Sequence, residues 1–168
     1  MSKQDKALTL LDQGIQALNK RDYESAKISF EASLEEDELA AAYTNLGLLA
    51  MGDGEMDLAR EHFQKAIQLD PREYSAYNNL AAIEQGSERL REAEQFYLKS
   101  IQLNPNGTEA YYNLGLMYVR QEKLVQAKTA FEKVTQLNPD ILDAFYMLGN
   151  VYANLQDYYA AVANFQYL

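Results

Sequence analysis

The stretch that decides the fold is residues 40–71, which read AAAYTNLGLLAMGDGEMDLAREHFQKAIQLDP. Its residue types return after 34 residues, and return twice more at the same interval before the sequence ends at Leu168. Pro71, Pro105 and Pro139 mark this period independently of any alignment. A fixed period of roughly 20 to 50 residues is typical of stacked supersecondary units that bury their apolar faces on one another. The sequence therefore predicts an array rather than a globule with one centre.

Within each unit, the same residue types stand at fixed places. An aromatic residue and a Leu-Gly or Leu-Ala pair lie in the first half, and an alanine followed by an aromatic residue lies in the second half. These residues are Tyr43, Leu46, Gly47, Ala59 and Phe63; Tyr77, Leu80, Ala81, Ala93 and Tyr97; Tyr111, Leu114, Gly115, Ala127 and Phe131; and Phe145, Leu148, Gly149, Ala161 and Phe165.

This pattern resembles the tetratricopeptide repeat, a helix-turn-helix unit of the same length. The resemblance implies an all-α fold, a right-handed superhelical solenoid of about five repeats of which the last is incomplete. The repeats are expected at approximately 7–39, 40–73, 74–107, 108–141 and 142–168. Glu84 departs from the family pattern, because it stands where the first helix usually carries an aromatic or apolar residue.

Composition excludes several classes of function. The formal net charge is −10, so the surface repels nucleic-acid phosphates and favours a protein or peptide partner with some basic character. The chain has no cysteine and one histidine, His62, around which no catalytic constellation can be read. We expect no enzymatic activity, no cofactor and no metal site.

The sequence also bears on location. Its start, Met-Ser-Lys-Gln-Asp-Lys, lacks the apolar segment of a secretory signal, and no window reaches the roughly 18 apolar residues of a membrane span. A soluble cytoplasmic protein is the expectation.

Three asparagines, Asn45, Asn79 and Asn113, recur 34 residues apart at mid-helix positions. Asparagine is a poor helix former, so its recurrence there calls for a reason. The resemblance implies that the first helices line a concave groove that holds a peptide. A primary amide can pair with both the N–H and the C=O of a peptide backbone, so the three predict an asparagine ladder. The alternative is that these amides only brace neighbouring helices.

Other residues are projected onto the same groove as anchors for the peptide. Aromatic and apolar side chains supply most of the binding energy at protein interfaces. The lysine and arginine clamp with which some family members hold chaperone tails is absent, since Leu11, Ile15, Ser75 and Asn79 occupy its positions. The predicted anchors and flanking polar residues are Leu48, Asn78, Tyr112, Leu116, Tyr146 and Asn150.

The last sixteen residues, 153–168, carry a single charge at Asp157. Apolar residues crowd both sides of the expected helix, whereas the end of a repeat array normally shows a polar capping face. We therefore expect that the native chain continues or that another chain covers this end. The residues predicted to self-associate are Tyr159, Val162, Ala163 and Tyr167.

Together these features predict a non-catalytic scaffold for protein–protein interactions. Two alternatives stay open at the level of sequence. The chain can be the N-terminal docking or regulatory region of a longer protein with an enzymatic domain, or a module that assembles with itself through its apolar last helix.

Overall fold

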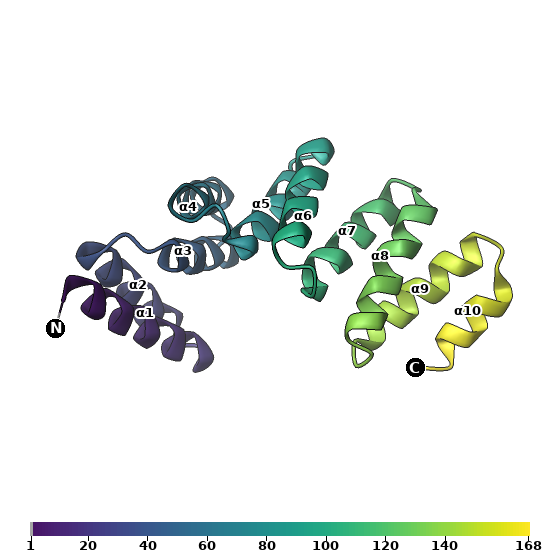
Figure 1. Ribbon diagram of the computed structural model, residues 1–168, viewed down its shortest axis with the longest axis horizontal. Helices are drawn as coiled ribbons and strands as arrows, with labels where there is room; N and C mark the ends of the chain where they lie inside the picture. The colour runs from purple at the N-terminus through teal and green to yellow at the C-terminus, as the bar shows by residue number, and fades with distance from the viewer. Residues whose placement is uncertain (1) are drawn as a thin grey trace. The chain divides into compact units, whose positions relative to one another are not determined.

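The computed structural model describes residues 2–168, which form ten α-helices and no strand (Figure 1). The helices follow one another with short turns, as the repeat period requires. The predicted all-helical repeat fold is thus confirmed. The helices are α1 (Lys3–Asn19), α2 (Tyr23–Glu36), α3 (Ala40–Gly52), α4 (Met56–Leu69), α5 (Tyr74–Gly86), α6 (Leu90–Leu103), α7 (Thr108–Arg120), α8 (Leu124–Leu137), α9 (Leu142–Asn154) and α10 (Tyr158–Phe165).

The chain divides into two compact units, Met1–Ile83 and Glu84–Leu168, and the division falls within α5. In the first, the N-terminal unit, α1 packs on α2, α2 on α3, and α3 on α4. In the second, the C-terminal unit, each helix from α6 to α10 packs on the next one along the chain. Packing on sequence neighbours is what makes a repeat array nearly one-dimensional.

A glycine on the first helix of a repeat meets a phenylalanine ring on the second. A Cβ atom added to Gly47 would lie 2.6 Å from the Phe63 ring, and one added to Gly149 would lie 2.5 Å from the Phe165 ring. No real Cβ contact is that short, so only glycine lets the two helices approach this closely. The recurring Leu-Gly pair therefore sets the distance between the paired helices.

The third repeat differs in sequence at these two positions. It carries Ala81 in place of the glycine and Tyr97 in place of the phenylalanine, and the Tyr97 ring is buried. The Tyr97 hydroxyl donates a hydrogen bond to Gln85 Oε1 at 3.0 Å. Glu84, the departure noted in the sequence, is also buried, and its carboxylate accepts a hydrogen bond from Arg89 Nε in the following turn.

The turn inside each repeat places one residue in the left-handed backbone region. This residue is Gly54 in the second repeat, with φ of 81°, and Arg21, Glu88, Glu122 and Gln156 in the others, with φ between 58° and 64°. The next residue closes the preceding helix, for example by the Lys123 N–H donating to the Tyr118 carbonyl at 2.9 Å. This bond pattern is the Schellman motif, which here reverses the chain between the paired helices.

Candidate protein-interaction surfaces

The three ladder asparagines all lie mid-helix, on α3, α5 and α7. The Asn45 Nδ2 donates to the Ala41 carbonyl at 2.8 Å, and the Asn79 Nδ2 donates to the Ser75 carbonyl at 2.9 Å. Asn154, outside the ladder, makes the same bond one turn back, so this bond alone is no sign of a ligand site. The Asn79 Nδ2 also lies 3.5 Å from Ser75 Oγ.

Accessibility differs among the predicted peptide-binding residues. Asn78 and Asn79 are only 3% and 8% exposed, so a ligand could touch little of either side chain in this conformation. Asn45 and Asn113 are partly exposed, and Leu48 is exposed. Among the predicted peptide-binding residues of the N-terminal unit, Asn45 and Leu48 are therefore the ones that a partner could reach.

The predicted anchors Tyr112 and Tyr146 occupy equivalent places on α7 and α9. The Tyr112 ring meets the Phe131 ring edge-on, with 5.6 Å between centroids, and the Tyr146 ring lies 6.2 Å from the Phe165 ring. Each tyrosine is thus held against the phenylalanine of its own repeat, and half of Tyr146 is exposed. Leu116 and Asn150 on the same helices are partly exposed.

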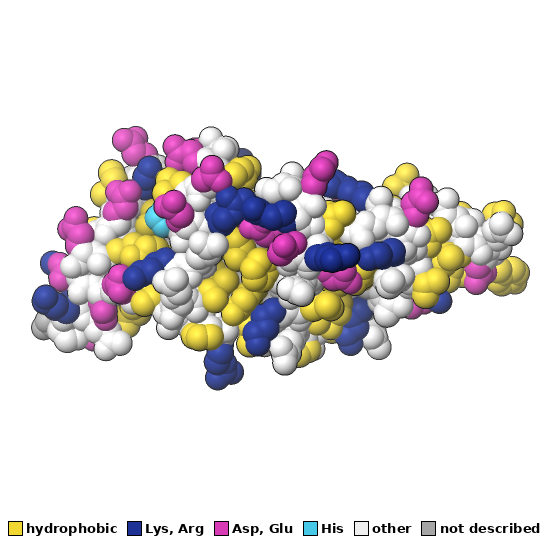
Figure 2. All heavy atoms as spheres, turned by 90° about the horizontal axis from the view of Figure 1, so that it is seen from above, with side chains coloured by type: hydrophobic (Ala, Val, Ile, Leu, Met, Phe, Trp, Pro, Cys, Tyr) yellow, Lys and Arg dark blue, Asp and Glu magenta, His cyan; other side chains and the backbone are white. Residues whose placement is uncertain are grey.

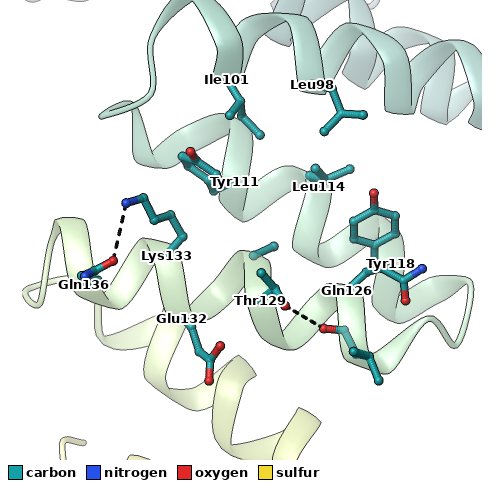
Figure 3. Close-up of a pocket in the computed structure, with 12 residues that line it drawn as sticks. Leu98, Ile101, Tyr111, Leu114, Tyr118, Gln126, Thr129, Glu132, Lys133 and Gln136 are labelled. Atoms are coloured by element: carbon teal, nitrogen blue, oxygen red, sulfur yellow. Dashed lines mark hydrogen bonds between the residues drawn. The ribbon is translucent and has the colours of Figure 1, made fainter.

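A second surface, which we call the C-terminal groove, opens between α6 and α8 and has α7 as its floor (Figure 3). Its volume is about 810 Å³. In Figure 3, Leu98 and Ile101 point into it from α6, and Tyr111 and Leu114 point into it from α7. It is lined by Leu98, Ile101, Tyr111, Leu114, Tyr118, Val125, Gln126, Thr129, Ala130, Glu132, Lys133 and Gln136.

Most charged side chains at the C-terminal groove already form hydrogen bonds within the C-terminal unit. The Tyr118 hydroxyl donates to Glu94 Oε1 at 2.6 Å, and burial together with this bond raises the pKa of Tyr118. The Tyr152 hydroxyl donates to Glu132 Oε1 at 2.5 Å. Lys133 Nζ donates to Gln136 Oε1 at 3.5 Å and has no carboxylate partner within residues 2–168. Lys133 is therefore the charge that this groove offers to a ligand.

An equivalent surface, the N-terminal groove, lies between α2 and α4 over α3. Its volume is about 260 Å³. His62 lines it and packs on Tyr43 with 5.9 Å between ring centroids. Burial lowers the pKa of His62, because removal from water disfavours the charged imidazolium. Its lining is Lys27, Glu31, Leu46, Leu49, Ala50, Asp53, Glu55, Leu58 and His62.

Sequence reasoning missed the C-terminal groove, although the sequence contains a signal for it. Leu98 and Val125 are exposed leucine and valine residues on second helices. One and two periods earlier, the equivalents of Val125 are Arg91 and Asp57. An apolar residue at an exposed position where the other repeats have a charged one would have indicated an apolar surface, because the packing of the repeat does not require an apolar residue there.

The predicted self-association residues are exposed at the end of the C-terminal unit. Tyr159 is 92% exposed, and Tyr158, Tyr159, Val162, Ala163 and Gln166 line a hollow of about 510 Å³. Hydrophobic side chains gather at this end in Figure 2. Tyr167 lies beyond α10 and stacks on Phe145 of α9, with 4.4 Å between ring centroids, so part of that ring is already used within the unit.

Neither a metal cluster nor a membrane span is found in the described chain. Within residues 2–168, no group of three histidine or acidic side chains is placed to hold a metal ion. No helix in the same range combines the length and apolar character needed to cross a bilayer.

Comparison with protein families and solved structures agrees with the repeat pattern. Three family models, each described as a tetratricopeptide repeat, match residues 38–105, 108–141 and 142–166. Comparison with curated protein sequences found no match.

Several solved structures are similar over nearly the whole chain. One is PilF from Pseudomonas aeruginosa, with 26% identity and a TM-score of 0.89 over 98% of this chain and 76% of PilF. MamA has 26% identity and a TM-score of 0.77 over 92% of this chain and 91% of MamA. YrrB, described as a repeat protein with an unusual peptide-binding site, has 23% identity and a TM-score of 0.70, and the match covers 96% of this chain and 84% of YrrB.

Proposed function

The chain belongs to the tetratricopeptide repeat family, and we propose that it is a non-catalytic scaffold that binds a peptide or protein segment on its first helices. Membership of this family and the similarity to solved repeat proteins such as PilF and YrrB support a role in protein interaction at the level of the fold. The observation that carries the proposal is the pair Tyr112 and Tyr146. Each ring contacts the phenylalanine of its own repeat, Phe131 or Phe165, yet remains at least partly open to a partner.

Preorganised aromatic rings are suited to binding. A tyrosine that is already packed loses little conformational freedom when a partner covers it, and such side chains dominate measured binding energies. Leu116 and Asn150 add an apolar contact and an amide on the same helices. Asn113 supplies the ladder amide of α7, and Asn45 with Leu48 extends the proposed contact set to the N-terminal unit.

The expected affinity is modest. Hydrogen bonds to the two partly exposed ladder amides, Asn45 and Asn113, contribute about 0.5–1.5 kcal/mol each, and each aromatic anchor adds about 1–3 kcal/mol. Ordering a flexible peptide offsets part of this gain. We expect a dissociation constant in the micromolar range. The acidic chain favours a segment with basic residues, and the proposed location is cytoplasmic.

Site-specific photocrosslinking tests the proposal. A benzophenone amino acid placed at Tyr146 should capture a partner segment from the source cell, and mass spectrometry would identify it. The same probe at Ile28, which is exposed on α2 and lies outside both grooves, is the control. Equal capture at both positions would contradict a site on the first helices.

The asparagine ladder has its own test with the segment so identified. Replacing Asn45, Asn79 and Asn113 with alanine should weaken binding by about tenfold or more, equivalent to 1.4 kcal/mol, with little loss of stability. Asn154→Ala is the matched control, because Asn154 makes the same bond to its own helix without being in the ladder. Unchanged affinity of the triple variant in a calorimetric titration would leave the asparagines with a bracing role only.

Self-association is a second function, favoured by the exposure of the apolar face of α10. Single exposed apolar residues are ordinary, but Tyr159, Val162 and Ala163 line one continuous hollow. We expect the molar mass measured by light scattering to rise with concentration. A constant monomer mass across a dilution series would remove this function.

A further inference from the structure

The C-terminal groove and the apolar face of α10 belong to the same unit but do not fill each other. The groove is lined by residues of α6, α7 and α8, while α10 packs on α9. In Figure 1, α10 lies on the far side of α9 from α6 and α7. Each copy of the chain therefore presents a receiving surface and an inserting surface at the same time.

The two surfaces match in apolar character. At the groove, Val125 is 62% exposed and Leu98 is nearly half exposed, with the side chain of Ile101 beside them. On α10, the exposed side chains of Tyr158, Tyr159 and Val162 lie side by side and line one hollow. Covering these side chains would remove apolar area from water on both partners, at about 25 cal/mol per Å².

The charges match as well. Lys133 on the rim of the groove has only an amide partner within residues 2–168, whereas Glu132 is engaged by the Tyr152 hydroxyl. Asp157, at the start of α10, is the single charged residue of the last sixteen. One of its oxygens accepts the Ala160 N–H at 3.1 Å, and a carboxylate can accept further hydrogen bonds. The groove thus suits an apolar helix with one acid, and α10 is such a helix.

We infer that α10 of one copy docks in the C-terminal groove of a second copy, with Tyr159 and Val162 against Leu98 and Val125. Asp157 of the inserted helix faces Lys133 on the rim. This inference rests on the proposed self-association and names the surface that receives α10.

The area of such a contact is sufficient if it is made twice. Two tyrosines bury roughly 300–500 Å² when covered, and the groove loses a similar area. Two reciprocal contacts then bury roughly 1,200–2,000 Å² in total, which is the range of specific interfaces. A reciprocal exchange between two copies also closes the assembly, because both groove and helix of each copy are occupied.

Two charge-introducing variants test the contact by sedimentation velocity and light scattering. Val125→Glu disables the groove and Tyr159→Glu disables the helix, and both side chains are exposed enough for the fold to be kept. Each variant alone should weaken association by at least about tenfold. Ile28→Glu, exposed on α2 and outside both surfaces, should leave association unchanged. Circular dichroism checks that all three remain helical.

Mixing the two disabled variants gives the decisive measurement. The Val125→Glu chain keeps an intact α10 and the Tyr159→Glu chain keeps an intact groove, so the mixture regains one of the two contacts. It should associate more tightly than either variant alone and more weakly than the unmodified chain. If Tyr159→Glu dissociates the assembly but Val125→Glu does not, or if the mixture associates no more tightly than either variant alone, the groove is not the receiving surface and the inference is overturned. If the unmodified chain is monomeric throughout, self-association itself fails.

Discussion

The two grooves occupy the same place in the repeat and differ in what they can bind. Leu98 of the C-terminal groove corresponds to Glu31 of the N-terminal groove, and Ala130 corresponds to His62. The C-terminal groove has about 810 Å³ and mostly apolar walls, whereas the N-terminal groove has about 260 Å³ and four formally charged side chains in its lining. The repeat therefore provides the groove, and a few outward positions decide its chemistry.

The largest expected loss of stability comes from removing the buried phenylalanine ring near each groove. Phe63→Ala and Phe131→Ala each remove a fully buried phenylalanine and should lower the free energy of unfolding by about 3–5 kcal/mol. The loss should be greater for Phe131, because Tyr112 also packs on that ring. Urea denaturation followed by circular dichroism measures both variants. A loss at Phe63 greater than that at Phe131 would contradict this account.

Exchanging the outward residues should move apolar binding between the two grooves. Leu98→Glu with Val125→Asp gives these two positions the residue types of their N-terminal equivalents, Glu31 and Asp57. The pair should reduce binding of an apolar fluorescent dye to the C-terminal groove by about tenfold, or 1.4 kcal/mol. Glu31→Leu with Asp57→Val is the converse pair, and dye binding should rise. Dye titration of all three proteins shows whether the side chains or the backbone shape controls the groove.

Buried and hydrogen-bonded tyrosines make the stability of the C-terminal unit sensitive to high pH. Burial raises the pKa of Tyr97 to about 12, and the bond to Glu132 raises that of Tyr152 to about 12. Because these folded-state values exceed the ordinary value of 10.0, the stability they provide is present below pH 10 and is lost as the pH rises through about 12. The N-terminal unit has one such bond, from the Tyr43 hydroxyl to Glu38 Oε1 at 3.4 Å, and Ala50 stands where the C-terminal groove has Tyr118.

Tyr118→Phe tests this difference directly. It removes the bond to Glu94 and should cost about 0.5–1.5 kcal/mol at pH 7. The cost should shrink above pH 10, because the phenol then ionises in the unfolded chain while its raised pKa keeps it protonated in the folded protein. Denaturation at pH 7 and pH 11 measures both values, with Tyr23→Phe, an exposed tyrosine on α2, as the control. A cost that does not change with pH would be inconsistent with ionisation of Tyr118.

The smallest effect is expected at the turns. Gly54 and Glu122 occupy the same left-handed position beside the two grooves. Gly54→Ala should destabilise by about 1 kcal/mol, because a Cβ atom is strained there although space is open around it. Glu122→Gly should stabilise by less than about 1 kcal/mol, since relief of strain is partly offset by the entropy of glycine in the unfolded chain. Thermal denaturation resolves the opposite signs.

The fold could be predicted because its signal is local and repeated. The Leu-Gly pair and the aromatic residue that packs on it recur at a constant interval, and each repeat contacts mainly its neighbours. The sequence indicates the left-handed residue of the turn only in the second repeat, where it is Gly54. At the equivalent positions Glu88 and Glu122 no glycine marks it.

The candidate site was predicted less completely. The period located the asparagines, but it did not show that Asn78 and Asn79 are buried. The composition of the last sixteen residues indicated the apolar face of α10, but it did not show that Tyr167 stacks on Phe145. Burial and ring contacts depend on side chains from other helices, which a single repeated pattern does not describe.

By itself, the sequence determined that the chain is an acidic array of helix pairs with an uncharged last helix, because period and composition are properties of the chain. Only the tertiary structure decided where an open apolar groove lies. Leu98, Tyr111 and Val125 come from three helices and line one groove only because those helices pack together. A groove is the space left between packed elements, so it exists only once the elements are in place.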